Sequence, residues 1–166
     1  EYASGVTAGE IVIDIEGRKH DCVAALVNGQ QKDFSAVLES DCAVEGISGF
    51  SDDGIYILRH SAAHLLAQAI NSIYPDAKPT IGPPVDRGFY YDFANLDNFG
   101  ESELKAMQKK MHELARKNLT LERVVCTESE LKNLFSDNPY KIEIMNDKLE
   151  AGEGSTIYRQ GDWYDL

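Results

Sequence analysis

Long apolar runs, paired cysteines and an excess of basic residues are all missing from this chain. No run approaches the ~18–20 apolar residues of a membrane span, and the first residues lack the basic-then-apolar pattern of a signal peptide. Cys22, Cys42 and Cys126 form no C-x-x-C pair, which favours reduced thiols over a disulfide framework or a structural zinc site. We therefore expect a cytoplasmic protein without a membrane span.

Basic residues are outnumbered: the 166-residue chain has 28 Asp and Glu against 16 Lys and Arg, a net charge of -12. A protein that grips nucleic acid over a broad surface usually has the opposite balance, so any such contact should be local. The basic cluster formed by Lys109-Lys110 and Arg116-Lys117 is interpreted as a solvated helix face.

The first 50 residues have the pattern of a small α+β unit. Thr7 followed by Glu10 is a capping box, which predicts a short helix. Asn28-Gly29 follows an apolar run and predicts a β-hairpin, because both residues of a type I′ turn need positive φ. Another strand fits 42–47. Glycine and small polar residues over 49–54 then predict a domain boundary.

The second region predicts a long helix over 55–74, ended by Pro75. At 100° per residue its aliphatic side chains share one face. A polar stripe falls on the opposite face and comprises His60, His64, Gln68 and Asn71. We expect the helix to pack through its aliphatic face and to expose this stripe.

The remaining pattern alternates between short strands and helices, which completes an α+β chain. An aromatic strand is predicted over 88–93, with Tyr90 and Tyr91 on opposite faces. The other predicted elements are helices over 101–118, 128–135 and after Pro139, and strands over 119–125 and 155–160.

His60 and His64 are one helical turn apart, so their imidazoles should be neighbours. The pair could serve as two metal ligands, or as a general base with an orienting partner. Ser61 stands where zinc proteases carry a glutamate, and two imidazoles fall short of a zinc site. From the spacing alone, two histidines on a polar helix face without a catalytic or metal-binding role are the favoured interpretation. By the same reasoning Tyr91 is a packing residue, and Lys141 and Asp165 are solvated.

Several separate motifs together resemble threonyl-tRNA synthetases of the bacterial type, over nearly the whole chain. The motifs are Arg59-His60-Ser61-Ala62-Ala63-His64-Leu65-Leu66-Ala67, Ile81-Gly82-Pro83-Pro84, Gly88-Phe89-Tyr90-Tyr91-Asp92, Met107 to Ala115, and Pro139-Tyr140-Lys141. The resemblance implies a ubiquitin-like TGS domain of β-grasp fold over 1–50, its opening strand shortened or missing. It implies an α+β editing domain over 51–166, with a long helix packed on an antiparallel sheet, incomplete at its C-terminal end.

The resemblance also implies a function. The parent enzyme would attach threonine to its tRNA with ATP, and this region would hydrolyse the ester of mischarged seryl-tRNA(Thr). His60, His64 and Lys141 match catalytic positions, whereas Tyr91 and Asp165 match substrate-binding ones, Asp165 as a receptor for the substrate's ammonium group. Lys141 would hold the terminal ribose, a phosphate or developing negative charge.

The implied partners are the acceptor end of tRNA(Thr) and the rest of the synthetase chain, whose parent is expected to be a homodimer. No metal or cofactor is expected here, since the parent's ATP and zinc belong to an aminoacylation domain that this chain lacks. One departure stands out: the family follows the residue matching Asp165 with a Cys-x-x-x-His motif, whereas this chain ends at Leu166. Two alternatives stay open, a non-catalytic tRNA-docking or structural module and a metal site of the alanyl-tRNA synthetase type.

Overall fold

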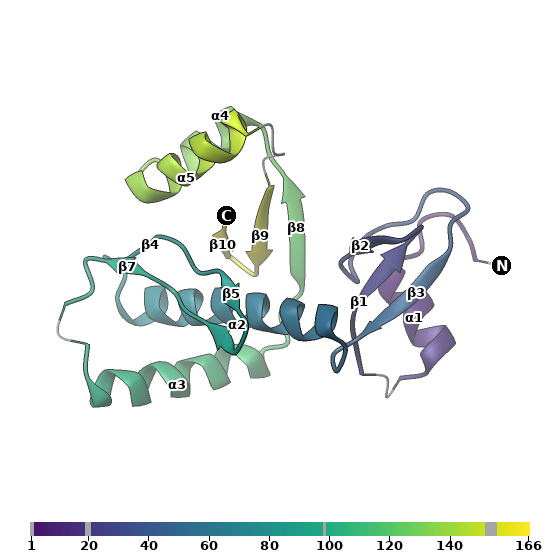
Figure 1. Ribbon diagram of the computed structural model, residues 1–166, viewed down its shortest axis with the longest axis horizontal. Coiled ribbons are helices and arrows are strands. Elements are labelled where there is room, and N and C mark those ends of the chain that lie inside the picture. Colours follow the sequence, from purple (N-terminus) through teal and green to yellow (C-terminus); the bar gives the residue numbers. More distant parts are fainter. Residues whose placement is uncertain (1, 19–20, 98, 152–155) are drawn as a thin grey trace. The chain divides into compact units, whose positions relative to one another are not determined.

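The computed structural model describes residues 2–18, 21–97, 99–151 and 156–166, and its architecture is α+β, as predicted (Figure 1). The chain divides into two compact units, Glu1–Arg59 and His60–Leu166, and the division falls inside helix α2 (Asp52–Ile73). Each unit has its own cluster of buried apolar side chains. Among the described residues, no helix has the length and apolarity needed to cross a membrane.

The first unit packs one helix on a three-stranded antiparallel sheet, in the order β2-β1-β3. Its elements are α1 (Ala8–Glu16), β1 (Cys22–Val27), β2 (Gln30–Lys32) and β3 (Val44–Ser48). The capping box of Thr7 and Glu10 starts α1 as predicted. Asn28 and Gly29 have φ of 51° and 76°, which confirms the predicted hairpin between β1 and β2.

Helix α2 begins at Asp52, three residues before its predicted start, and ends at Ile73, one residue before its predicted end. Its first turn lies against the end of β3. A Cβ on Gly54 would be 1.9 Å from the carbonyl oxygen of Ser48, so this close approach of two backbones requires glycine.

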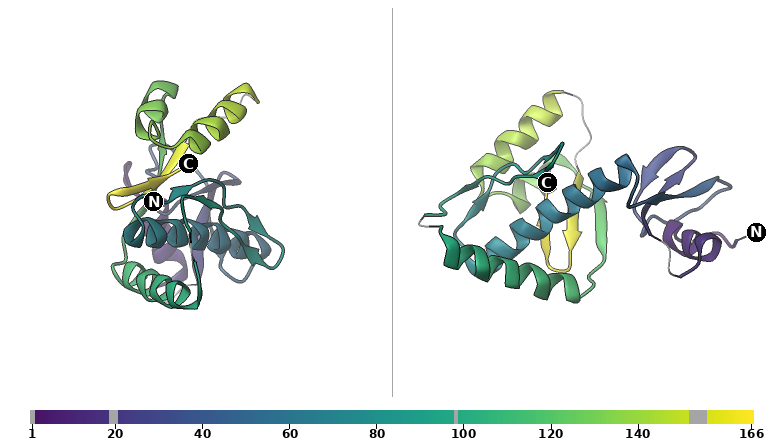
Figure 2. Two further views of the ribbon diagram at one scale, coloured as in Figure 1. Left: turned by 90° about the vertical axis from the view of Figure 1, so that its left-hand side faces the viewer. Right: turned by 60° about the horizontal axis from the view of Figure 1, so that its bottom comes forward.

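The second unit surrounds the remainder of α2 with a three-stranded antiparallel sheet, in the order β10-β9-β8, and three further helices. Helix α3 lies alongside this part of α2 (Figure 2). The sheet strands and helices are β8 (Leu121–Val125), β9 (Thr156–Gln160), β10 (Trp163–Asp165), α3 (Glu101–Arg116), α4 (Glu128–Leu134) and α5 (Pro139–Glu150). These elements agree with the predicted ones to within two residues, apart from β10, which was not predicted. The first residue of the predicted strand over 155–160, Ser155, lies outside the described residues.

The predicted aromatic strand over 88–93 is wrong. Its two ends belong to separate two-residue strands, and Tyr90, Tyr91 and Asp92 lie between them without strand structure. The short strands pair as β4 with β7 and β5 with β6, and they are β4 (Lys78–Pro79), β5 (Pro84–Val85), β6 (Gly88–Phe89) and β7 (Phe93–Ala94). Tyr90 is nevertheless 48% exposed while Tyr91 is partly buried, so the two rings do have different surroundings.

The prediction of an exposed polar stripe on α2 is also wrong. His64 and Gln68 are buried, because β9 and β10 cover this face of the helix. The amide nitrogen of Gln68 donates to the carbonyl of Gln160 at 3.2 Å, and the indole nitrogen of Trp163 donates to Asn71 at 3.4 Å. The predicted packing of a long helix on an antiparallel sheet is therefore present, and it uses the polar face of the helix.

Candidate functional site

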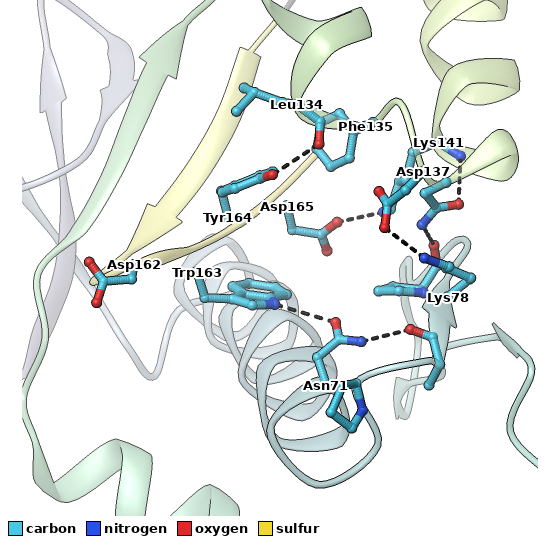
Figure 3. Close-up of a pocket in the computed structure, with 14 residues that line it drawn as sticks. Asn71, Lys78, Leu134, Phe135, Asp137, Lys141, Asp162, Trp163, Tyr164 and Asp165 are labelled. Atoms are coloured by element: carbon cyan, nitrogen blue, oxygen red, sulfur yellow. Dashed lines mark hydrogen bonds and ion pairs between the residues drawn. The ribbon is translucent and has the colours of Figure 1, made fainter.

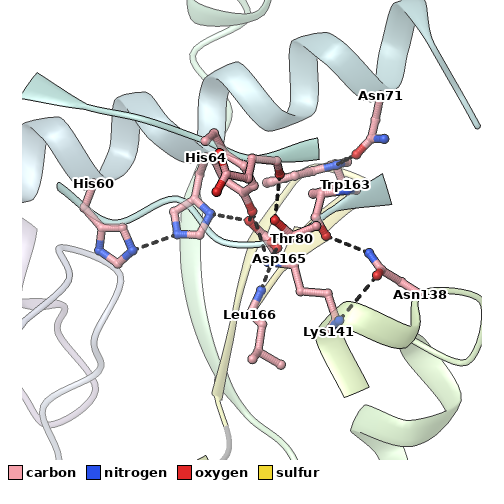
Figure 4. Close-up of polar contacts among 12 residues, drawn as sticks. His60, His64, Asn71, Thr80, Asn138, Lys141, Trp163, Asp165 and Leu166 are labelled. Atoms are coloured by element: carbon pink, nitrogen blue, oxygen red, sulfur yellow. Dashed lines mark hydrogen bonds and ion pairs between the residues drawn. The ribbon is translucent and has the colours of Figure 1, made fainter. Parts of the chain in front are cut away.

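All five site residues predicted from the sequence meet in the second unit, although they come from four separate segments. Helix α2 provides His60 and His64, β10 provides Asp165, α5 provides Lys141, and the irregular segment between β6 and β7 provides Tyr91. Figure 4 shows how His60, His64, Lys141 and Asp165 lie relative to one another.

The two histidines and Asp165 form a continuous row of hydrogen bonds. Nδ1 of His64 lies 2.9 Å from Oδ2 of Asp165, and Nε2 of His64 lies 3.1 Å from Nε2 of His60. The carboxylate accepts, so Nδ1 of His64 carries a hydrogen and its Nε2 faces His60. The imidazole of His64 is thus fixed in ring orientation and tautomer from one side, as in orienting carboxylate–histidine pairs.

Lys141 and Tyr91 complete the surroundings of the same carboxylate. Nζ of Lys141 lies 2.6 Å from Oδ1 of Asp165 and donates to the hydroxyl of Tyr91 at 3.0 Å. The Tyr91 hydroxyl donates in turn to Oδ2 of Asp165. Asp165 and Lys141 are only 1% and 3% exposed, so the prediction from spacing that both are solvated is wrong. They form a buried, hydrogen-bonded ion pair.

Burial and the neighbouring charges set the protonation states. Burial alone would raise the pKa of Asp165, but the hydrogen bond from His64 and the charge of Lys141 outweigh it and hold this pKa below its usual value. Burial, followed by the carboxylate, raises the pKa of Tyr91, which keeps its hydroxyl protonated. Burial and the neighbouring His64 lower the pKa of His60 to about 4, so His60 is neutral at physiological pH.

The carboxylate of Asp165 has no unused acceptor oxygen. Oδ1 accepts from Lys141 and from the backbone N–H of Leu166 at 2.9 Å, while Oδ2 accepts from His64 and Tyr91. An incoming ammonium group would have to displace one of these donors. The geometry therefore favours an orienting role for Asp165 over the ammonium-binding role that the resemblance implies.

Three further residues shape the site. A Cβ on Gly82 would lie 2.1 Å from the ring of Tyr91, so glycine is needed for that ring to reach Asp165. The ring of Tyr158 packs against His60 and His64, with centroids at 5.8 and 5.5 Å, and the ring of Trp163 lies 6.2 Å from His64. The sequence indicated no role for Gly82, Tyr158 or Trp163, although Gly82 stands in one of the quoted motifs.

A cavity of about 290 Å³ with a mixed polar and apolar lining adjoins the ion pair (Figure 3). Lys141, Trp163 and Asp165 line it together with Lys78, which pairs with Asp137 at 2.7 Å, and neither histidine does. The ion pair of Lys141 and Asp165 therefore contacts His64 on one side and borders this cavity on another.

The arrangement suits proton transfer better than metal binding. Within the described part of the chain, no three His, Cys, Asp or Glu residues are grouped so as to hold a metal ion. His60 and His64 direct their Nε2 atoms at each other, and Nδ1 of His64 is engaged by Asp165. The two Nε2 atoms are therefore hydrogen-bonded to each other. Two metal ligands would instead both point at the metal ion.

Comparison with known proteins gives a consistent picture over the whole chain. Residues 1–47 match the model of the TGS domain family. The chain is 43% identical over 169 residues to a threonine–tRNA ligase of Acidithiobacillus ferrooxidans, 41% over 161 residues to that of Thermoplasma acidophilum, and 36% over 167 residues to that of Staphylococcus carnosus.

These alignments cover 97–100% of this chain but only 24–26% of the relatives. The chain thus spans about a quarter of the length of the curated relatives that it matches. A TGS match over residues 1–47 and similarity to three ligases along nearly all of this chain agree with the motifs quoted from the sequence. The chain belongs to the threonine–tRNA ligase family, as the part of it that carries the TGS domain.

Proposed function

We propose that this region proofreads for its ligase by hydrolysing the ester bond of seryl-tRNA(Thr). The observation that carries the proposal is the hydrogen-bonded row of His60, His64 and Asp165, whose carboxylate is also held by Lys141 and Tyr91. A neutral imidazole backed by an oriented imidazole and a carboxylate is an arrangement suited to general base catalysis. Burying an ion pair costs stability, so a purely structural module has less reason to retain one.

The chemical need for such a site is simple. Serine lacks one methyl group of threonine, and a group of that size gives only about 1–3 kcal/mol of discrimination during aminoacylation. A second site that removes serine after attachment supplies the missing accuracy.

His60 is the histidine that is only partly buried, and we assign it the contact with the attacking water. The water oxygen bonds to the aminoacyl carbonyl carbon while His60 takes its proton. The C–O bond to the ribose then breaks, and the ribose oxygen receives that proton. The products are free serine and tRNA with its terminal hydroxyl restored.

His64 and Asp165 stabilise the positive charge that His60 gains in this step. The carboxylate holds His64 through Nδ1, and His64 shares a hydrogen with His60 through Nε2. Lys141 and Tyr91 hold the carboxylate in place in turn. In this assignment Asp165, Lys141 and Tyr91 are positioning residues.

The rest of the parent's activity follows from the family. The ligase would attach threonine to tRNA(Thr) with ATP, in a zinc-containing aminoacylation domain outside this chain. This region itself would need no metal or cofactor. Its partners would be the acceptor end of the tRNA and the remaining ligase chain, within a cytoplasmic homodimer.

A deacylation assay on the intact ligase tests the proposal. We expect His64→Ala to slow hydrolysis of seryl-tRNA(Thr) by about 10²-fold or more, the usual contribution of general acid–base catalysis. His112→Ala, which changes an exposed histidine on α3, is the matched control and should leave the rate unchanged. Hydrolysis at the normal rate in His64→Ala would refute the mechanism. Binding of the tRNA without any hydrolysis by the unaltered protein would identify a docking module instead.

A further inference from the structure

The side chain of Asn138 links the first turn of α5 to strand β4 (Figure 4). Its carboxamide nitrogen donates to the carbonyl of Pro79 at 2.8 Å, and its oxygen accepts from the backbone N–H of Lys141 at 3.3 Å. Asn138 is the N-cap of α5 and is only 5% exposed. One buried side chain therefore both starts this helix and joins it to a strand 59 residues earlier in the chain.

The orientation of this carboxamide is set by its two partners. A flipped carboxamide would place its NH₂ group against the N–H of Lys141 and its oxygen against the carbonyl of Pro79, so both hydrogen bonds would be lost. The backbone of Asn138 is engaged as well, since its N–H donates to the carbonyl of Phe135 and its carbonyl accepts from the N–H of Ile142. Each polar group of Asn138 thus has a partner inside the protein, although the residue lines the cavity beside the ion pair.

A second contact joins the same two segments but is weaker. Nζ of Lys78 lies 2.7 Å from a carboxylate oxygen of Asp137, whose side chain is 76% exposed. Water screens an ion pair with so exposed a member, so it contributes little. Pro79 and Asn138 are both buried, and breaking their hydrogen bond would leave polar groups unsatisfied inside the protein. The hydrogen bond of Asn138 is therefore the contact that holds α5 against β4.

Both sides of this link continue to the carboxylate of Asp165. On the α5 side, Nζ of Lys141 lies 2.6 Å from Oδ1 of Asp165. On the β4 side, the backbone N–H of Thr80 donates to the carbonyl of Asp92 at 2.9 Å. The residue before Asp92 is Tyr91, whose hydroxyl donates to Oδ2 of Asp165. The link thus joins the two segments that carry Lys141 and Tyr91, whose ammonium and hydroxyl groups are 3.0 Å apart.

We propose that Asn138 is a further positioning residue for deacylation, which holds Lys141 and Tyr91 in place against Asp165. In this role it contacts neither the substrate nor the attacking water. Without the link α5 would move relative to β4, and the carboxylate would no longer keep His64 in one orientation. The effect on rate rests on the proposed function, whereas the link between α5 and the Tyr91 segment can be measured without turnover.

Two substitutions remove the link but keep an acceptor at the N-cap of α5. Asn138→Ser has a side chain too short to reach the carbonyl of Pro79, and Asn138→Asp keeps the shape of the side chain but lacks the N–H donor. Asn146→Ser, at an exposed position of the same helix, is the matched control. Steady-state deacylation of seryl-tRNA(Thr) by the intact ligase is measured for each variant.

We expect both Asn138 variants to lower kcat by about tenfold to 10²-fold, as for a displaced reacting geometry, and to leave KM within about twofold of its value in the unaltered protein. Asn146→Ser should match the unaltered protein. A higher KM at unchanged kcat would make Asn138 a substrate-binding residue, and unchanged kcat and KM would reduce it to a structural cap. Either result would overturn the inference.

Hydrogen exchange in the intact ligase tests the link without turnover. We expect Asn138→Ser to speed exchange in the first turn of α5 and also at the hydrogen-bonded N–H groups of Thr80 and Asp92, because both segments lose their common contact. Faster exchange in α5 alone would show a cap that does not act on the Tyr91 segment, and would overturn the inference. A ligase that leaves seryl-tRNA(Thr) intact would refute the proposed function, and the exchange data would still decide whether Asn138 joins the two segments.

Discussion

At the scale of single residues, Asp165 holds three side chains at once, from α2, α5 and the segment before β7. Nearly all of its surface is removed from water, so each partner is needed both to satisfy the carboxylate and to keep it charged. Removing that charge should disturb stability and chemistry together.

Asp165→Asn keeps the shape of the side chain but leaves the buried Lys141 without a counter-ion. We expect the free energy of unfolding to fall by about 3–5 kcal/mol and deacylation to fall by about 10²-fold or more. Urea unfolding and a deacylation assay measure the two effects. Asp162→Asn, in the exposed turn between β9 and β10, is the matched control. An unchanged unfolding midpoint in Asp165→Asn would contradict the burial of this pair.

His60 makes stability depend on pH. Its pKa is about 4 in the folded protein against an ordinary 6.5, so the unfolded chain takes up a proton first as the pH falls. The contribution of His60 is therefore complete above about pH 6.5 and is lost as the pH falls toward 4. We expect His60→Gln to lose less stability than the unaltered protein between pH 7 and pH 4.5.

Chemical unfolding at these two pH values checks the difference. His112→Gln should follow the unaltered protein, because His112 is exposed on α3. The same pH dependence in the unaltered protein and in His60→Gln would mean that His60 is not buried against His64.

At the scale of elements, the hairpin β5–β6 and its neighbours keep Tyr91 against the carboxylate. Gly82→Ala would place a methyl group within 2.1 Å of the Tyr91 ring. We expect a loss of about 1–3 kcal/mol in stability, as for overpacking, and slower deacylation because Tyr91 no longer reaches Asp165. Gly88→Ala on the same hairpin, where a Cβ meets nothing within 4 Å, should be nearly neutral. Equal thermal unfolding temperatures for the two variants would contradict this packing.

Local signals in the sequence predicted most elements well, because the capping box of Thr7 and Glu10 and the Asn28-Gly29 turn depend on nearby residues alone. The neighbouring positions of His60 and His64 follow from helical spacing in the same way. The partner Asp165 is 101 residues from His64, and no local pattern specifies that contact. The resemblance singled out Asp165 and Lys141, but only the fold shows that they neutralise each other.

Two of the wrong predictions, the exposed polar stripe and the aromatic strand, share a cause. Amphipathic spacing on α2 assumes that polar residues face water, whereas β9 and β10 bury this polar stripe by hydrogen bonds. The aromatic residues over 88–93 have strand propensity, yet Tyr90 and Tyr91 lie outside the short strands at the two ends of this stretch, where Tyr91 contacts Asp165. In both places tertiary contacts around the candidate site override the local preference.

At the scale of the whole molecule, two separate apolar clusters stabilise the two units, one in each. One lies between α1 and its sheet, and the other lies among α4, α5 and β9. Val12 belongs to the first cluster and Met145 to the second, and both are 1% exposed. A cavity in the first cluster should therefore lower stability alone, whereas a cavity in the second should lower both stability and the deacylation rate.

Val12→Ala should destabilise the protein by about 2 kcal/mol through cavity formation and leave deacylation unchanged below the unfolding temperature. Met145→Ala should cost about 2–5 kcal/mol and also slow deacylation, because Met145 anchors the helix that carries Lys141. Calorimetry and deacylation rates on both variants test this. A slower rate in Val12→Ala at full folding would show that the first unit contributes to the chemistry.

The hydrogen on Nδ1 of His64 has a consequence for spectroscopy. It lies between a ring nitrogen and an ionised carboxylate 2.9 Å away, and solvent hardly reaches it. Such a proton exchanges slowly with water and is strongly deshielded, so it should give a separate downfield line in a one-dimensional NMR spectrum. That line would report on the orientation of the imidazole without any substrate, and a change in its position during a titration with a serine ester would follow occupancy of the site.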